Sequence, residues 1–255
     1  MPNTYDTRQS TQDFIVSTFD ELRDLIENEI SDIGDYVFRG QSNSDWGLTS
    51  SLDRLIAHAR QTGAKQNSID DFVQSHLERF RLEIRGRRGD NPPRLEENEL
   101  WALGQHFGLA TPLLDWSQSP YISVFFALGS INEREANRVL WCLHRSRVEK
   151  INESLSERER LKLIIPDSDD NKRLLGQSGL FSKGPVLRSV DKWVGQRAPA
   201  NSGPVLLKVV FPGNFQFRKA ALSTLQLMNI NHSTLFPDLM GASLYCNIIA
   251  EDYGV

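Results

Sequence analysis

The sequence predicts an α+β fold: a single domain with a helical N-terminal half around a small central sheet, mixed or antiparallel. Two observations lead to this prediction. Apolar residues recur at helical spacing through most of the first half, whereas residues 138–144, 178–182 and 203–211 read as strands. Helices that dominate early and strands that come late favour α+β over a regular βαβ alternation.

The composition is that of an ordinary globular protein, with 39% hydrophobic and 24% charged residues in a chain of 255. The net charge of −4 gives no global attraction to nucleic acid or anionic lipid, so a nucleic-acid role would need a local basic patch. No apolar run approaches the ~18 residues of a membrane span, and the polar start lacks the core of a signal peptide. Two cysteines provide no disulfide framework. We therefore expect a cytoplasmic protein without a membrane segment.

The first elements follow from local patterns. We expect a polar tail over residues 1–14 and one domain over residues 15–255. An amphipathic helix over residues 18–30 begins with a capping box. The stretch "DYVFRG", residues 35–40, predicts a strand that runs into a turn.

Further helices are expected in the first half at residues 50–60, 69–86, 95–108 and 119–130. Between two of them, "RRGDNPPR" (87–94) is a polar loop that we expect to be mobile within the single domain. In the second half, helices are expected at residues 219–229 and 237–249.

The first candidate functional residues lie where the predicted strand "YVF" ends. Arg39, Gly40 and Gln41 follow it directly. This arginine is either a surface residue on an ordinary turn or a cation directed into a cleft. A guanidinium can donate two parallel hydrogen bonds to a phosphate, which gives the second alternative its chemical content.

A second group of polar residues lies between two apolar helices. The segment "GQHFGLATPLLDWSQSP" contains Gln105, His106, Thr111, Asp115, Trp116, Ser117 and Ser119. Polar residues crowded between buried elements indicate the lip of a cleft. The alternative is that Asp115, Ser117 and Ser119 are turn and capping residues.

Four ordered blocks resemble the FRG domain family, which is named for a Phe-Arg-Gly motif. They are "FRG" (38–40), "QHFGLATPLLDWSQSPYISVFFA" (105–127), "RLLGQSGLF" (173–181) and "LFPDLMG" (235–241). The resemblance covers roughly residues 15–250. Pro112 stands where that family usually has an arginine, so a role of that arginine does not carry over to this chain.

The order of these motifs resembles a divergent ADP-ribosyltransferase pattern. The resemblance implies that Arg39 takes the first position, facing NAD, and that Trp116 and Ser117 take the second. Gln177 falls near the third position, where the broader fold carries a catalytic glutamate. Because an amide cannot supply charge or take a proton, Asp115 is the other candidate for the charged group.

On this reading Arg39, Asp115, Gln177 and His106 are the candidate catalytic residues. Candidate NAD-binding residues are Arg39, Gly40, Gln41, Thr111, Trp116 and Ser117. Gly40 would let the ligand approach the backbone, Trp116 would stack on a ring, and Ser117 would brace the third position by a hydrogen bond. Alternatively, Arg39 and Asp115 form a structural ion pair, and Gln177 braces the backbone.

The resemblance implies an NAD-using ADP-ribosyltransferase-like enzyme, a toxin or anti-phage defence effector. It would transfer ADP-ribose to a protein or nucleic acid, or hydrolyse NAD. The alternative is a non-catalytic module that binds a nucleotide or a partner in the same cleft. A nuclease is disfavoured because the acidic cluster of two-metal sites is missing, and no metal site is expected. Five arginines in "RFRLEIRGRR" (79–88) either dock RNA or DNA or form a solvated helix end.

Overall fold

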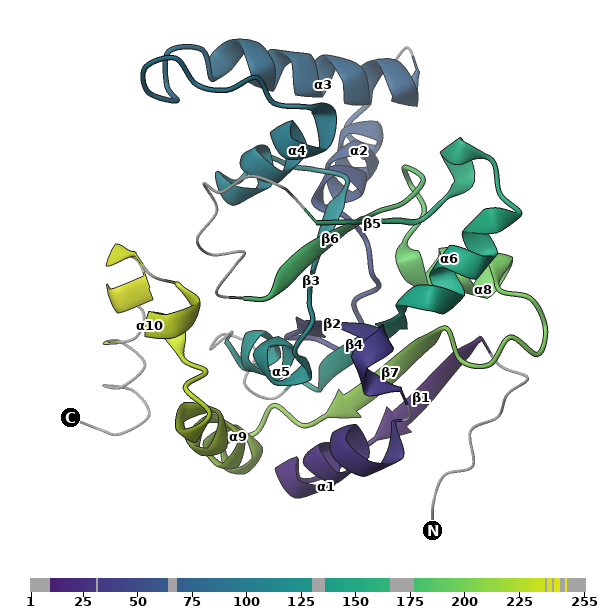
Figure 1. Cartoon of the computed structure of the whole chain (residues 1–255), viewed down its shortest axis with the longest axis vertical. Helices are drawn as coiled ribbons and strands as arrows, with labels where there is room; N and C mark the ends of the chain where they lie inside the picture. The colour runs from purple at the N-terminus through teal and green to yellow at the C-terminus, as the bar shows by residue number, and fades with distance from the viewer. Residues whose placement is uncertain are drawn as a thin grey trace.

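The computed structural model describes residues 10–30, 32–63, 68–129, 136–165, 177–236, 238–239, 241–243 and 246. Within these ranges the chain forms one mixed sheet of seven strands (Figure 1). Their spatial order is β1 (Thr11–Ile15), β7 (Leu206–Phe211), β4 (Arg138–His144), β2 (Tyr36–Gln41), β3 (Leu113–Ser117), β6 (Gly179–Lys183) and β5 (Lys162–Ile164). β1 and β7 run parallel, and all other neighbours run antiparallel.

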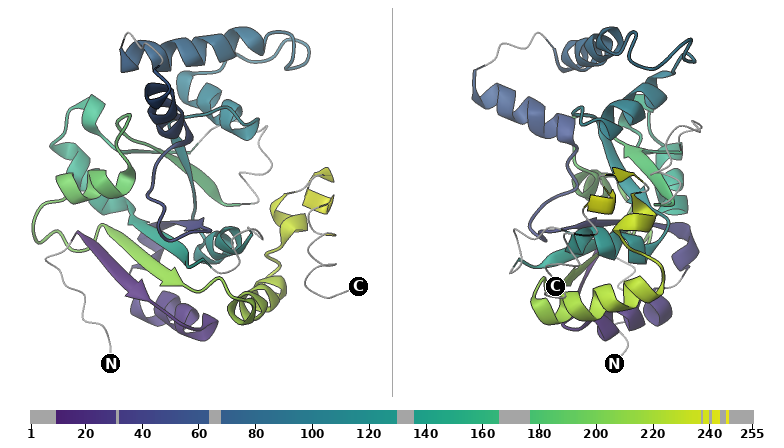
Figure 2. Two further views of the ribbon diagram at one scale, coloured as in Figure 1. Left: turned by 180° about the vertical axis from the view of Figure 1, so that it is seen from behind. Right: turned by 90° about the vertical axis from the view of Figure 1, so that its left-hand side faces the viewer.

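Helices cover both faces and one end of this sheet (Figures 1 and 2). The first face is covered by α1 (Phe19–Asp24), α5 (Pro120–Leu128) and α9 (Phe215–Leu227). The second is covered by α6 (Arg145–Glu153) and α8 (Val190–Arg197). A third cluster joins α2 (Ser51–Gln61), α3 (Ile69–Glu83) and α4 (Glu97–His106) to β3 and β6. Shorter elements are a π-helical turn η1 (Leu25–Glu29), 3-10 turns η2 (Ile33–Asp35) and η3 (Glu157–Glu159), and α10 (His232–Leu235).

The sheet splits near its centre, between β2 and β3. These strands pair through a single position, Phe38 opposite Ser117, whereas β2 and β4 pair along six positions. Figure 1 shows β3 and β6 running steeply across the direction of β2. The two strands therefore part just beyond Phe38, and the next residue of β2 is Arg39.

The close approach of α5 to β2 explains the glycine after Arg39. A Cβ atom on Gly40 would lie 1.8 Å from the main-chain oxygen of Ser123 and 2.8 Å from the nitrogen of Ala127, both in α5. Because a glycine leaves this space empty, α5 can pack directly on the strand. The Cβ position of Gly40 is thus taken up by the helix, whereas the expected approach of a ligand to its backbone stays a prediction.

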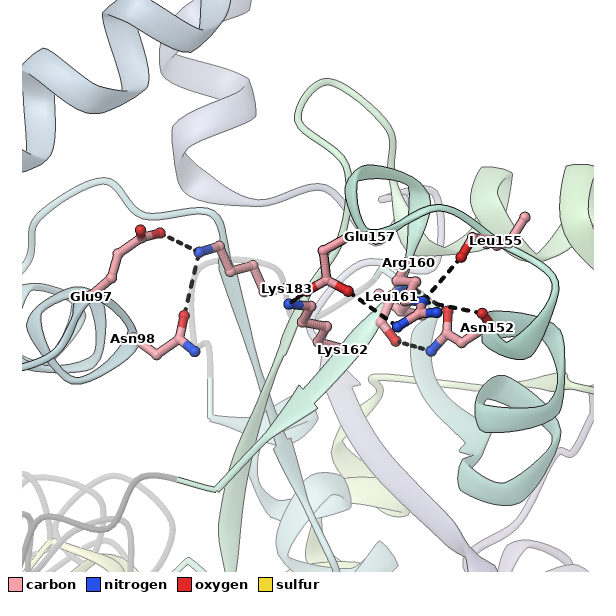
Figure 3. Close-up of polar contacts among 9 residues, drawn as sticks. All are labelled: Glu97, Asn98, Asn152, Leu155, Glu157, Arg160, Leu161, Lys162 and Lys183. Carbon is pink, nitrogen blue, oxygen red and sulfur yellow. Dashed lines mark hydrogen bonds and ion pairs between the residues drawn. The ribbon is translucent and has the colours of Figure 1, made fainter.

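Hydrogen bonds and ion pairs fix α4 against the sheet. Lys183 of β6 contacts Glu97 Oε1 at 2.6 Å and Asn98 Oδ1 at 3.3 Å, both in the first turn of α4 (Figure 3). The hydrogen bond from Lys183 lowers the pKa of the Glu97 carboxyl, although partial burial opposes the shift. The start of this helix is thus held at the sheet, and its other end carries Gln105 and His106.

The predicted helices of the first half are confirmed, with small shifts at their ends. The strands at 138–144 and 178–182 are confirmed, whereas β7 begins only at Leu206. The prediction of a mixed sheet also holds, but the sheet is not small, and three of its strands belong to the first half. Among the described helices, none has both the length and the apolar character needed to cross a membrane.

Several elements escaped the sequence patterns. The expected tail at residues 1–14 overlaps β1, whose Phe14 is buried. The local sequence pattern indicates only a polar connection before Ser119, whereas the stretch contains β3 (Leu113–Ser117). The sequence patterns also missed α6, α8, α10 and the three-residue strand β5. Most of the helix expected at 237–249 lies outside the described residues.

Candidate functional site

A cavity of about 390 Å³ opens where β2 and β3 part. Its walls come from β2, β3, α4, α5, β6 and the segments that hold Gln177 and Phe236. The lining residues are Phe38, Arg39, Gly40, Ala102, Gln105, His106, Asp115, Trp116, Ser117, Ser123, Phe126, Gln177, Phe181 and Phe236. The volume lies at the lower end of the range for small-molecule sites.

Arg39 spans the gap between the two parted strands. Its Nη1 donates to the main-chain oxygen of Asp115 at 2.8 Å and lies 3.5 Å from Asp115 Oδ2. Its side chain is 21% exposed, and its Nε is buried with no hydrogen-bond partner in the described part of the chain. Burial lowers the pKa of the guanidinium, and Asp115 opposes this shift. Arg39 nevertheless remains cationic, as arginine does throughout the physiological range.

Asp115 is the carboxylate nearest to Arg39. Gln105 Nε2 donates to its Oδ1 at 2.7 Å, and the Asp115 side chain is 62% exposed. The Thr111 hydroxyl donates in turn to Gln105 Oε1. Because Oε1 accepts from Thr111, the amide group of Gln105 must present its nitrogen to Asp115. These hydrogen bonds orient the Asp115 carboxylate, which still contacts solvent.

Gln177 and Ser117 form another part of the cavity wall. Ser117 Oγ donates to the main-chain oxygen of Gln177 at 2.7 Å and accepts from Ser119 N at 3.0 Å. The Gln177 side chain donates to the main-chain oxygen of Leu235 at 3.2 Å. The predicted bracing of Gln177 by Ser117 is therefore present as a hydrogen bond to its backbone. The Gln177 amide itself holds the end of α10.

Aromatic rings complete the walls. Phe126 of α5 meets Phe236 edge-on, with ring centroids 5.9 Å apart, and Phe236 stacks on His232 at 5.9 Å. Phe38 and Phe181 add buried apolar surface. A guanidinium, a carboxylate and aromatic rings around one cavity suit a ligand that has both a planar ring and an anionic group.

The structure brings most of the predicted site residues together. Arg39, Gly40, His106, Asp115, Trp116, Ser117 and Gln177 all line this cavity. Thr111 and Gln41 do not line it. Thr111 is fully buried, and its backbone bonds to Ser51 and Leu52 at the start of α2. Gln41 accepts from the indole nitrogen of Trp141 at 2.8 Å, so both residues bond to other protein groups and neither borders this cavity.

Trp116 reaches the cavity as a core residue. Only 3% of it is exposed, and its indole nitrogen donates to Ser182 Oγ at 2.8 Å within the second-face core. It therefore cannot offer a full ring face to a ligand. Phe126 and Phe236 are better placed for stacking because they are only partly buried.

Sequence patterns missed several wall residues, including Ala102, Ser123, Phe126, Phe181 and Phe236. Four of them read as ordinary apolar residues, and none carries a local signal of a cleft. Ala102 lies one helical turn before His106, and this spacing is the single hint that could have placed it on the same wall. Among the described residues, no group of three or more His, Cys, Asp or Glu side chains is placed to hold a metal ion.

Comparison with known proteins gave one match. Residues 34–136 match the family model described as the FRG domain. This range contains the first two sequence blocks, with Arg39 and Asp115, and excludes the blocks at 173–181 and 235–241. Neither a protein of curated function nor a solved structure matched significantly.

Proposed function

Because residues 34–136 of this chain match the FRG domain family model, and Arg39 and Asp115 within this range line one cavity, we propose that the protein binds NAD there and cleaves it as an ADP-ribosyltransferase-like enzyme. One observation carries the proposal. A partly buried guanidinium, whose Nε has no hydrogen-bond partner among the described residues, lies beside a carboxylate that remains 62% exposed. Arg39 offers donors to a phosphate, and Asp115 offers negative charge to a sugar.

The guanidinium and the carboxylate would have distinct roles in this reaction. The bond between ribose C1′ and the nicotinamide nitrogen breaks, and nicotinamide leaves with the electron pair. Positive charge then develops at C1′, which a nearby carboxylate stabilises. Water or an acceptor hydroxyl supplies the new bond to C1′, and its proton passes to a base such as His106 or to solvent. An ADP-ribosyltransferase-like fold, as well as a role as a toxin or anti-phage effector, belongs to the same proposal.

The ion pair between Arg39 and Asp115 is consistent with these two roles. The two side chains partly compensate each other's charge in the structure. A phosphate that takes up the guanidinium donors would draw Arg39 away from Asp115. The negative charge of Asp115 would then act on the sugar without the compensating cation, while the hydrogen bond from Gln105 keeps the carboxylate oriented.

A non-catalytic binding module is the second candidate, and two observations favour it. Gln177 stands near the position of a catalytic glutamate, and its amide is already bonded to Leu235. Asp115 is engaged by both Arg39 and Gln105. Such a module would bind a nucleotide without turnover.

One experiment separates the two candidates. The purified protein is incubated with NAD, binding is measured by calorimetry, and free nicotinamide is measured by chromatography. We expect Arg39→Ala to abolish NAD binding. We expect Asp115→Asn to retain binding but to lower nicotinamide release by about 100-fold, the usual scale for loss of a group that stabilises transition-state charge.

A matched ion pair outside the cavity provides the control. Arg23 and Asp20 lie 3.1 Å apart on α1, so Arg23→Ala and Asp20→Asn should change neither binding nor release. Binding of NAD without any nicotinamide release in the wild-type protein would select the binding module. Absence of both would contradict the use of NAD.

A further inference from the structure

A second cavity adjoins the candidate site along α4. Its volume is about 250 Å³, and it is enclosed by α4 and the loop that follows α3. Ala102 and His106 line both cavities. Since these two residues are four apart on one helix, the last turn of α4 is the wall between the cavities. A molecule in the second cavity would touch the same imidazole that faces the first.

The second cavity has a basic and aromatic lining. Arg87 is 74% exposed, and its ion-pair partner Glu83 is 3.9 Å away, a distance at which a surface pair is weak. Arg88 donates through Nη1 to the main-chain oxygen of Pro93 at 2.9 Å, which closes the loop and leaves its other donors for a ligand. The lining also contains one carboxylate, Glu99, whose Oε2 accepts from Glu96 N at the start of α4.

Phe107 adds an unusual surface feature. It follows His106 at the end of α4, and 74% of it is exposed. Its ring stands edge-on to the imidazole, with centroids 4.8 Å apart. An exposed aromatic ring beside two guanidinium groups is the combination that binds single-stranded nucleic acid, because bases stack on the ring and phosphates pair with the cations.

We propose that this second cavity is a binding site for single-stranded nucleic acid, which it positions beside His106 at the edge of the candidate site. One base stacks on Phe107, and flanking phosphates contact Arg87 and Arg88. The role of this strand as ADP-ribose acceptor rests on the proposed function, whereas the binding itself does not. The overall charge of −4 means that attraction is local to these arginines.

Fluorescence anisotropy tests the site directly. The probe is a labelled single-stranded oligouridylate of roughly eight nucleotides, within the length that one stacking surface covers. We expect Phe107→Ala and Arg87→Ala each to weaken binding by about 5-fold or more. Arg87→Ala should also reduce the slope of log affinity against log salt by about 0.7, the share of one phosphate contact on a single strand.

Controls of similar exposure are available elsewhere on the surface. Phe215 on α9 is 67% exposed, and Arg158 is exposed in η3, so Phe215→Ala and Arg158→Ala should bind like the wild-type protein. Equal affinity of Phe107→Ala, Arg87→Ala and wild type would overturn the proposal. Equally tight binding of a poly-glutamate peptide of the same charge would also overturn it, because charge alone would then explain the site.

Oligonucleotide binding is measured without NAD, so the two proposals can fail separately. The protein could bind the oligonucleotide, respond to these variants and yet fail to bind NAD. That result would support this proposal and contradict the proposed enzyme activity. NAD binding without strand binding would do the reverse. If both bind, transfer of label from NAD to the oligonucleotide should fall in Phe107→Ala, while nicotinamide release into water is retained.

Discussion

At the scale of single residues, Arg39 and Gly40 have different physical tasks although they are adjacent. The side chain of Arg39 crosses to β3 and bonds the backbone of Asp115. Gly40 has no side chain because Ser123 of α5 lies where a Cβ atom would stand. The Phe-Arg-Gly motif therefore combines a core residue, a bridging cation and a contact point for a helix.

We predict that Gly40→Ala destabilises the protein strongly. The added methyl group forces α5 away from β2, and overpacking of this kind costs roughly 1–3 kcal/mol or more of unfolding free energy. Urea unfolding at neutral pH measures the effect. Gly195→Ala in α8 is the control, since no atom of the described residues lies within 4 Å of its Cβ position; it should be neutral or slightly stabilising. An unchanged midpoint for Gly40→Ala would contradict the close packing of α5.

At the scale of elements, α4 is the helix on which the site depends most. Lys183 holds its first turn, and its last turn presents Gln105 to Asp115 and His106 to the cavity. Movement of this one helix would therefore displace two walls at once. Its attachment to β6 also links the third core cluster to the sheet.

We predict that Lys183→Met reduces the acid sensitivity of folding. The pKa of Glu97 is lowered in the folded protein, so its stabilising contribution is present above the unfolded-state pKa of about 4.5 and disappears as pH falls below it. Without Lys183 that contribution is absent at every pH. Unfolding free energies at pH 6 and pH 3.5 should differ less in the variant. Lys150→Met, on the exposed face of α6, should behave like wild type.

At the scale of the whole molecule, two buried histidines affect how the unfolding free energy responds to mild acidification. Burial lowers the pKa of both His144 and His232. His144 Nδ1 lies 3.0 Å from Asp35 Oδ2, which opposes its shift, while Arg147 adds to it. His232 packs edge-on against Phe125, near the positive charge of Arg218. Both therefore favour the neutral imidazole in the folded state.

We predict that the protein loses stability as pH falls below about 6.5, the ordinary histidine value. Below it the unfolded chain binds protons that the folded protein resists, so the unfolding free energy decreases until the lowered folded-state pKa is passed. His144→Gln should reduce the difference between pH 7.5 and pH 5.5 in urea unfolding. The exposed His58 on α2 provides the control variant His58→Gln. An equal loss in wild type and His144→Gln would contradict the assignment.

The sequence predicted the helices and the gathering of Arg39, His106, Asp115 and Gln177 better than it predicted the sheet. Helical periodicity extends over many residues, whereas β3 and β5 are short and carry few alternating positions. The aromatic wall could not be predicted, because Phe126 and Phe236 meet only after α5 and α10 have packed. Thr111 looked functional because a polar residue near a cleft resembles a ligand contact, but it is a fully buried hydrogen-bonding partner of α2.

The boundaries of the matched family segment cut through the middle of the sheet. Within residues 34–136 lie β2 and β3, two interior strands, whereas their outer neighbours β4 and β6 come from later in the chain. A fragment limited to this segment would therefore leave both strands with an unsatisfied ladder on one side. The matched segment is therefore the interior part of a larger folding unit and not a self-contained module. Its transfer to another protein should fail unless β4 and β6 travel with it.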